Sequence, residues 1–198
     1  MIILPFDTET TRLPTYKLAL NDPAQPHLVS CSALQVEVPS WRIKQSMSKL
    51  VAPAGWEWPD DCPAKVNAHG LTAEECTIYG DSEKAILDEF LHLWFAGDTS
   101  HLVAHNLEFD RAIIAIAISR YYPGAVELLS TWQSASGTCT MQENKERVDA
   151  RTAKGSKKLP NLKETYRHFM GEDLEQHHSA NADAVAVFQI YQAMQEVI

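Results

Sequence analysis

Two carboxylates, one residue apart, follow the first hydrophobic run of the chain. Asp7 and Glu9 come directly after the largely apolar residues 2–6. If this run is a strand, side chains at positions i and i+2 point to the same face, so the two like charges lie side by side. Such a pair is unfavourable unless a cation lies between its members, and a metal ion is the usual one. The spacing therefore predicts a metal site at the end of an N-terminal strand.

Two more acids stand beside the ends of other elements. Asp110, in HLVAHNLEFDRAII, lies one turn into an expected helix that follows a strand, and Asp183, in HHSANADAVAV, lies in the first turns of the last helix. Taken singly, each is typical of a first-turn acid that interacts with the helix dipole. Together with Asp7 and Glu9 they offer the oxygen ligands that hard divalent cations prefer. We therefore expect these four carboxylates to meet in one metal cradle.

His178 offers a base for hydrolysis at such a site. It precedes Asp183 by five residues, at or just before the start of the last helix. An imidazole titrates near neutral pH and can take a proton from an attacking water. Two divalent ions about 4 Å apart can clamp the attacking and leaving oxygens of a phosphoryl displacement. An exposed loop histidine is the alternative, but the combination indicates metal-assisted hydrolysis of a phosphate ester.

The elements that must position these residues form a mixed α/β pattern with helices on a sheet. Apolar runs predict strands over residues 2–7, 27–38, 43–52, 101–106 and 137–141. Helical spacing predicts helices over 81–95, 107–121, 159–170 and 180–197. We expect Asn106 to cap the second of these, and Thr72 and Glu75 to form a capping box for a further helix. The apolar stripe of the last helix comprises Ala184, Val187, Phe188, Tyr191 and Met194. No repeat or break in composition divides the chain, so we expect one domain over residues 1–198.

Composition limits the classes of protein. With 45% hydrophobic residues in 198, the chain can bury a sizeable core. No apolar run approaches the ~20 residues of a membrane span, and we expect a cytoplasmic protein without membrane contact. Four scattered cysteines predict reduced thiols rather than a zinc site or disulfides. The net charge of -9 argues against a broad grip on nucleic acid, but eight of the 17 basic residues lie between Lys145 and Arg167.

Three motifs carry a family resemblance. The D-x-E of residues 7–9, the H-N-x-x-F-D of residues 105–110 and the H-x4-D of residues 178–183 resemble, in order, the motifs of the DEDDh (DnaQ-like) 3′-5′ exonuclease superfamily. This superfamily includes the proofreading epsilon subunit of bacterial DNA polymerase III and RNase T. The segments NAHGLT and KLPNLKETYRHF are also similar to parts of that family. The resemblance therefore spans nearly the whole chain.

The resemblance implies a ribonuclease-H-like fold with a five-stranded mixed sheet flanked by helices. It also implies removal of nucleoside 5′-monophosphates from DNA 3′ ends, most of all single-stranded ends, with two Mg²⁺ or Mn²⁺ ions. By position, Asp7, Glu9 and Asp183 would ligate metal directly. Asp110 would contact the second ion, often through water, and His178 would be the general base.

The resemblance has two points of departure or ambiguity. The family often has glycine where this chain has Arg12, and arginine adopts neither positive φ nor a close backbone approach easily. Arg12 either reaches a phosphate of the bound strand or lies on the surface. His177 is adjacent to His178, but its spacing to Asp183 does not match H-x4-D, so it ranks second as the base.

Substrate contacts follow from the resemblance and from residue chemistry. A frayed 3′ end can be held by stacking with little sequence preference. Leu71 would wedge against the terminal bases and His69 would face the sugar or phosphate. Phe109 would line the cleft or pack in the core. The full set of expected substrate-binding residues is Thr8 and Thr10, through backbone groups near the terminal 3′-OH, with His69, Leu71, Asn106 and Phe109.

Two weaker signals concern the surface. The polar, charged residues 143–158 predict little fixed structure, and the basic segment 151–163 is either a phosphate-contacting arm or a solvated loop. Trp56 and Trp58, in a Pro-rich loop, either stack bases or cover an edge of the core. The sequence does not decide either case.

The leading hypothesis is a DNA exonuclease, and three alternatives stay open. An RNA-trimming 3′-5′ exoribonuclease of the same family would need a contact to the 2′-OH, which no motif reveals. A catalytically degenerate nucleic-acid or polymerase-binding module is disfavoured because all five expected catalytic positions are filled. A phosphatase-type use of D-x-E would leave H-x4-D without a role. We expect a nucleic acid as the partner. The sequence leaves open whether a polymerase or a second copy of the chain also binds, which strand form is preferred, and whether the role is proofreading, repair or degradation.

Overall fold

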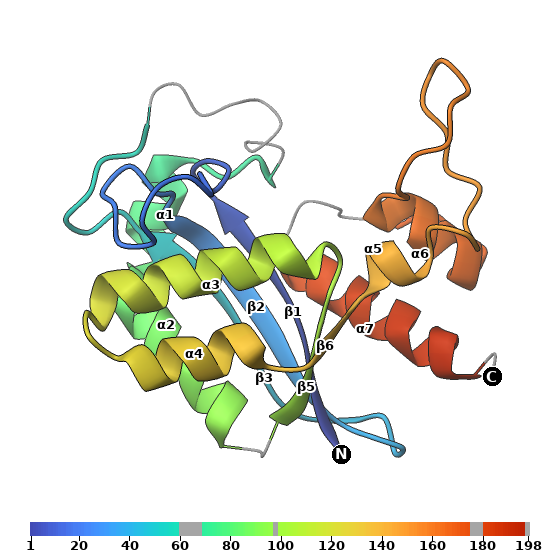
Figure 1. Cartoon of the computed structure of the whole chain (residues 1–198), viewed down its shortest axis with the longest axis horizontal. Coiled ribbons are helices and arrows are strands. Elements are labelled where there is room, and N and C mark those ends of the chain that lie inside the picture. The colour runs from blue at the N-terminus through green and yellow to red at the C-terminus, as the bar shows by residue number, and fades with distance from the viewer. Residues whose placement is uncertain (60–68, 97–98, 175–179, 197–198) are drawn as a thin grey trace.

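A single mixed sheet forms the centre of the molecule (Figure 1). The computed structural model describes residues 1–59, 69–96, 99–174 and 180–196. The sheet has the strand order β4-β3-β2-β1-β5-β6. Its strands are β1 (Ile2–Thr10), β2 (Leu28–Glu37), β3 (Arg42–Ala52), β4 (Asp81–Ser82), β5 (Thr99–Ala104) and β6 (Gly137–Cys139). β1, β2 and β3 are antiparallel neighbours, whereas β5 runs parallel to both β1 and β6.

The sheet has one strand more than the expected five. The sixth is the two-residue β4, which pairs in parallel with the end of β3 through Val51 and Ala52. The sequence predicted helix from Asp81 onward. Instead Ser82 is the N-cap, and its Oγ accepts the N–H of Ala85 at 3.3 Å, so the residues before the helix stay extended and can pair.

Helices cover both faces of the sheet, as expected. In chain order they are α1 (Ala73–Tyr79), α2 (Glu83–Phe95), α3 (Leu107–Tyr121), α4 (Val126–Ser134), α5 (Thr140–Glu143), α6 (Leu162–Met170) and α7 (Ala180–Glu196). One core lies between the sheet and α2, α3 and α4. The other lies between the opposite face and α6 and α7. Within the described residues, no helix is long and apolar enough to span a membrane.

Several local predictions are confirmed and others need correction. The capping box of Thr72 and Glu75 starts α1 as expected. α6 starts three residues later than expected, because Asn161 caps it in a second capping box. Asn106 holds the N-cap position of α3 with a left-handed backbone (φ 78°), and its side chain makes no capping hydrogen bond. α4 and α5 were not predicted.

The expectation of free thiols is confirmed for the described cysteines. Cys31 and Cys76 are buried and free, and Cys139 is partly buried and free. Cys62 lies outside the described residues.

Candidate active site

The alternation of side chains along β1 sets up the site. Leu4 and Phe6 point into the core under α2 and α3, and Ile3 points into the core under α7. Because successive residues of a strand face opposite sides, Asp7 and Glu9 share the face of Ile3, and Thr8 shares the face of Phe6. The prediction that the two acids lie on one face is therefore confirmed.

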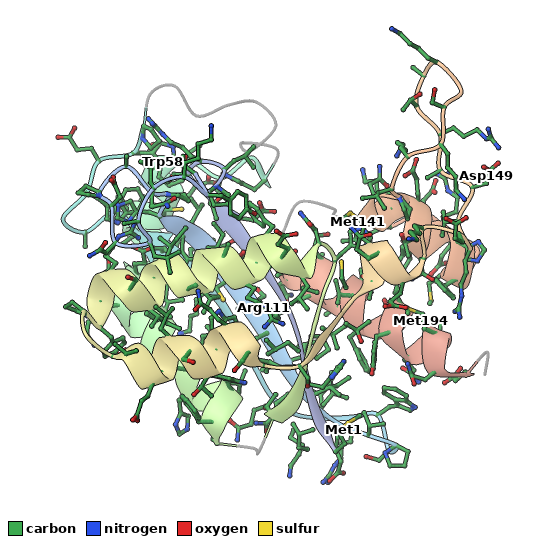
Figure 2. All side chains as sticks on the ribbon, in the orientation of Figure 1. Met1, Trp58, Arg111, Met141, Asp149 and Met194 are labelled. Carbon is green, nitrogen blue, oxygen red and sulfur yellow. The ribbon has the colours of Figure 1, made fainter. Side chains whose placement is uncertain are left out.

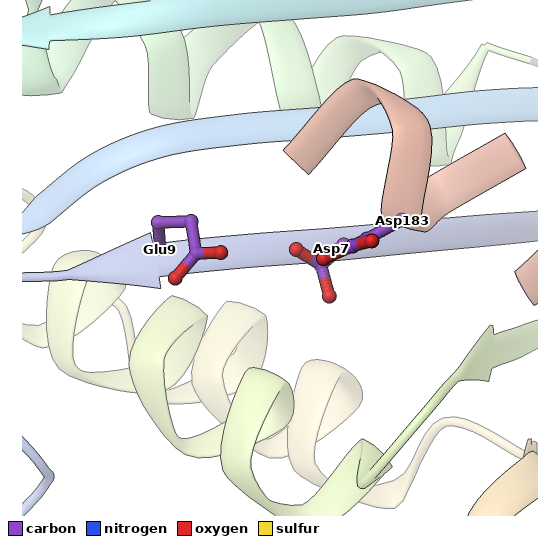
Figure 3. A group of neighbouring side chains, drawn as sticks. All are labelled: Asp7, Glu9 and Asp183. Atoms are coloured by element: carbon purple, nitrogen blue, oxygen red, sulfur yellow. The ribbon is translucent and has the colours of Figure 1, made fainter. Parts of the chain in front are cut away.

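The two acids of β1 meet a third from α7. Asp7, Glu9 and Asp183 each offer a carboxylate oxygen, and these oxygens lie within 4.8 Å of one another. Figure 3 shows the three side chains gathered where α7 passes over β1. We call these three residues the acid cluster. Oxygen-only donors of this kind fit a hard divalent cation.

Small side chains hold α7 close to the sheet at this point. Asp183, in the first turn of α7, is 4% exposed. It is followed by Ala184 and Ala186, both fully covered, which allow the helix backbone to approach the strands closely. Further along, Val187 and Ile190 pack against the sheet. The apolar face of α7 thus fixes where the carboxylate of Asp183 lies.

Asp110 approaches the site from the other face of the sheet. Its Oδ1 accepts two hydrogen bonds from Thr8, one from the backbone N–H at 3.0 Å and one from the hydroxyl at 2.8 Å. Thr8 therefore uses its backbone N–H and its hydroxyl to position Asp110. A contact between another backbone group of Thr8 and the terminal 3′-OH stays a prediction. Asp110 stands outside the close group of three oxygens but lines the same cavity.

Burial and mutual repulsion make the carboxyls of Asp7, Glu9 and Asp110 hard to ionise without a cation. Burial, reinforced by Asp110, Glu9 and Asp183, raises the pKa of Asp7 well above its usual range. Burial and the charges of Asp183 and Asp110 raise the pKa of Glu9 to about 8. Burial raises the pKa of Asp110 to about 7, against the opposing hydrogen bonds from Thr8. A divalent ion would offset both the repulsion between the carboxylates and the cost of burying their charges, so the donor set fits a metal.

A cavity of about 390 Å³ opens beside the acid cluster. It is lined by Asp7, Thr8, Glu9, Thr10, Leu13, His105, Asn106, Phe109, Asp110, Met141, Asn161, Leu162 and Asp183. The four predicted acids thus share one cavity with four of the predicted substrate contacts. Its apolar lining residues include Leu13, Phe109 and Met141. Figure 2 shows Met141 near the N-terminal end of α3.

Five lining residues were not predicted as site residues. Leu13 carried a signal, because it is an apolar residue in a turn region directly after E-T-T-R, and it is 60% exposed. His105 belongs to the second motif but was not expected in the site; it contacts the Thr140 hydroxyl at 3.0 Å and the Pro160 carbonyl at 3.2 Å. Asn161 and Leu162 stand in the KLPNLKETYRHF segment that the resemblance included, whereas Met141 comes from α5, a helix that the sequence did not predict.

Phe109 satisfies both readings, since it packs against the core and also lines the cavity. Thr10 lines it as well, and its hydroxyl donates to the backbone carbonyl of Arg12 at 2.8 Å. Arg12 itself is exposed and lines a different pocket of about 250 Å³, next to His27 and Trp56. Whether Arg12 contacts a phosphate stays a prediction.

His69 and Leu71 lie in a separate pocket of about 180 Å³ that adjoins the acid cluster across β2. The N–H of Leu71 donates to Nδ1 of His69 at 3.0 Å. The floor of the pocket includes Ser30 and Ser32, whose register partners on β1 are Glu9 and Asp7. Directly opposed residues of antiparallel strands share a face, so this pocket continues the surface that carries the acids.

One of the two tryptophans of the Pro-rich loop, Trp56, covers an edge of the core. Trp56 stacks on His27 with ring centroids 4.3 Å apart and an interplanar angle of 6°. It packs against the core under α2 and α3, and Trp58 stacks on it at 6.1 Å. The covering role is therefore confirmed for Trp56.

His178 and His177 lie outside the described residues, two and three positions before the first residue of α7.

Comparison of the whole chain with solved structures identifies the fold. E. coli exonuclease I in complex with a dT13 oligonucleotide has a TM-score of 0.72, at 17% identity over 98% of this chain and 41% of that chain. The zinc-bound form of an E. coli exonuclease I–single-stranded DNA complex also gives 0.72, at 16% identity over 99% and 40%. A product-bound exonuclease I gives 0.70, at 17% identity over 98% and 43%.

These likenesses confirm the expected ribonuclease-H-like fold, a mixed sheet flanked by helices. The chain spans about two fifths of the length of the exonuclease I chains that it matches. No protein-family model matches the sequence, and a search of curated proteins finds no match.

Proposed function

We propose that the chain is a metal-dependent 3′-5′ exonuclease that removes nucleoside 5′-monophosphates from the 3′ ends of single-stranded DNA. The observation that carries the proposal is the acid cluster, three carboxylate oxygens within 4.8 Å of one another on a fold shared with exonuclease I. The presence of Asp110 in the same cavity adds support. So do neighbours whose structures contain dT13 and other oligonucleotides.

The residues of the acid cluster would hold the metal, with Asp110 at the second position. We propose two Mg²⁺ or Mn²⁺ ions, because oxygen-only donors suit them. Bound divalent ions supply positive charge that polarises the phosphate and stabilises the leaving oxygen. Metal use in this fold is supported by the zinc-bound form of a structural neighbour.

The protein's own groups would orient the strand and move the proton. His178 would take a proton from the attacking water, since it stands five residues before Asp183 in the sequence. The apolar lining residues Leu13, Phe109 and Met141 would contact the terminal base without reading its identity. Thr8 would hold Asp110 in place through its two hydrogen bonds. The hydrolysis would thus draw on both faces of β1.

An assay with end-labelled strands tests the proposal. Purified protein is incubated with single-stranded DNA, duplex DNA and RNA, in Mg²⁺, Mn²⁺ or chelator. We expect a ladder that shortens from the 3′ end of single-stranded DNA and vanishes with chelator. Asp7→Ala and Asp183→Ala should abolish the ladder, whereas Glu127→Ala, an exposed acid of α4, should not. Full activity in Asp7→Ala would refute the proposal, and faster degradation of RNA than of DNA would make the chain an exoribonuclease.

A further inference from the structure

The segment expected to lack fixed structure forms a hairpin. Residues 149–158, which we call the basic hairpin, project away from the body of the molecule (Figure 1). Arg151 and Lys157 form an antiparallel bridge, and the N–H of Thr152 donates to the carbonyl of Ser156 at 2.8 Å. The turn is closed by the N–H of Gly155, which donates to the carbonyl of Thr152 at 2.8 Å. Gly155 has φ +82°, a backbone conformation that glycine adopts without strain.

The base of the basic hairpin is rooted at the rim of the catalytic cavity. Val148 and Ala150 are buried, and the N–H of Lys158 donates to the carbonyl of Ala150 at 3.0 Å. Two residues later, the carbonyl of Pro160 contacts Nε2 of His105 at 3.2 Å. Asn161, the next residue, lines the cavity. A continuous, hydrogen-bonded segment therefore joins the cavity to the hairpin.

The basic hairpin and the turn before it are positively charged in an acidic protein. Residues 145–158 contain six basic and two acidic side chains, a net charge of +4 in a chain of net charge -9. Lys154 is exposed at the tip. Arg151 pairs with Asp149 at 2.9 Å and Lys157 pairs with Glu146 at 2.5 Å, and all four side chains are exposed. Exposed pairs of this kind contribute little, so both cations can exchange their partners for a phosphate.

The reach of the basic hairpin can be bounded from the chain itself. An extended residue spans at most about 3.6 Å, so Lys157 lies within about 14 Å of Asn161 and Lys154 within about 25 Å. Phosphates along one stacked strand recur about every 3.4 Å. A strand that leaves the cavity toward the hairpin would therefore reach Lys157 by roughly its fourth phosphate and Lys154 by roughly its seventh.

We propose that the basic hairpin binds the phosphodiester backbone of the substrate strand upstream of its 3′ end, with single-stranded DNA as the partner. This inference rests on the proposed function, because it assigns the strand that leaves the cavity to this surface. The contact is electrostatic, so it adds affinity without sequence preference. It also reconciles a chain of strongly negative charge with a polyanionic substrate, since the favourable charge is concentrated where the strand emerges.

The test compares two triple variants with equal charge change. The hairpin variant is Arg151→Ser/Lys154→Ser/Lys157→Ser. The control is Arg42→Ser/Lys44→Ser/Lys84→Ser, which also removes three exposed cations, two of them ion-paired, from outside the hairpin. The affinity for dT16 is measured by fluorescence anisotropy in chelator from 50 to 400 mM salt. Cleavage of dT16 and dT3 is measured in Mg²⁺.

The hairpin variant should bind dT16 about 10- to 100-fold more weakly at ~0.1 M salt. The slope of log affinity against log salt should fall by about 2, since each lost contact to a single strand contributes about 0.7. Cleavage of dT3, which leaves little strand beyond the cavity, should be unchanged. The control should match the unmodified protein throughout.

Unchanged dT16 affinity and slope in the hairpin variant would overturn the inference and leave the hairpin a solvated turn. An equal loss on dT3 would overturn it too, because the hairpin would then act by shaping the cavity. Hairpin dependence with rU16 but not with dT16 would refute DNA as the partner. Failure of the exonuclease proposal would give a different result. The unmodified protein would then cleave neither oligonucleotide in Mg²⁺, while its binding of dT16 in chelator would still depend on the hairpin.

Discussion

Replacement of Glu83 by alanine is expected to destabilise the fold far more than its place in a charged stretch of sequence indicates. Glu83 opens α2 and is 2% exposed. Its carboxylate accepts hydrogen bonds from Arg120 at 3.1 Å, from the Tyr121 hydroxyl at 2.8 Å and from the N–H of Leu28 at 2.9 Å. It also bonds Nδ1 of His27 at 2.6 Å. One carboxylate thus ties α2 to the start of β2 and to the end of α3.

The size of the loss in stability follows from the buried charge of Arg120, which the substitution leaves without its partner. Removing one partner of a buried ion pair costs about 3–5 kcal/mol, because the other charge stays buried without compensation. Arg120 would keep the carbonyls of Gln25 at 3.1 Å and Pro26 at 2.9 Å, which limits the loss to the lower part of that range. We therefore expect the free energy of unfolding to fall by about 3 kcal/mol, and the melting temperature by about 6–12 °C.

Urea unfolding followed by circular dichroism measures this loss. The matched control is Lys84→Ala, one residue along the same helix, where the exposed pair of Lys84 and Asp88 at 2.8 Å should contribute less than about 1 kcal/mol. Glu83→Gln should fall between the two, because it keeps an acceptor oxygen but loses the charge. If Glu83→Ala were no less stable than Lys84→Ala, the carboxylate would not be the tie that these contacts indicate.

Four further predictions concern the site. In chelator, the free energy of unfolding should fall as the pH rises from about 5 to 8, because the folded protein holds protons on Glu9 (pKa about 8) and Asp110 (pKa about 7) that the unfolded chain has released. The gain in melting temperature on adding Mg²⁺ should therefore grow over this pH range. A gain that does not change with pH would contradict this prediction. Asp7→Asn should raise the metal-free melting temperature at pH 8, by removing repulsion, and abolish turnover. Thr8→Val should lower turnover about tenfold with a loss of stability near 1 kcal/mol, because one of two hydrogen bonds to Asp110 is lost. His178→Ala should reduce turnover severely but keep the Mg²⁺-induced gain in melting temperature; loss of that gain would identify His178 as a ligand.

The sequence predicts elements well where periodicity alone decides them. In α7 the expected stripe is largely buried, with Ala184, Val187, Tyr191 and Met194 covered and Phe188 only partly so. α4 was not predicted, although Leu128, Leu129 and Trp132 follow a helical spacing; it is short, and only Trp132 is buried along it. Tertiary contacts also hold this helix. The Trp132 ring N–H donates to the carbonyl of Arg111, and the Arg111 guanidinium donates to the carbonyls of Trp132, Gln133 and Ala135 at its C-terminal end.

In the site, too, the features that local sequence indicates could be predicted, and those set by long-range contacts could not. The acids could be predicted because residue type and spacing carry the chemistry, and three of them do converge. The bonds from Thr8 to Asp110 join residues 102 positions apart, and no local signal announces them. Glu83 was hidden for the same reason: its neighbours Ser82 and Lys84 are exposed, and its burial is decided by partners near positions 27 and 120. Long-range polar contacts were therefore the main gap.

Both kinds of contact depend on the register of β1. A slip of one residue would turn every side chain of the strand to the opposite face, taking Asp7 and Glu9 away from Asp183 and Thr8 away from Asp110. The register against β2 is held by buried residues on both faces of β1, Leu4 and Phe6 on one and Ile3 on the other. Glu83 adds a polar tie by accepting the N–H of Leu28, the residue where β2 begins and pairs with Thr10. The D-T-E stretch therefore acts as one unit. Its two acids meet Asp183 on one face of the sheet, and its threonine positions Asp110 from the other face. The core residues and the contact of Glu83 with Leu28 prevent the one-residue slip of β1 that would exchange the two faces.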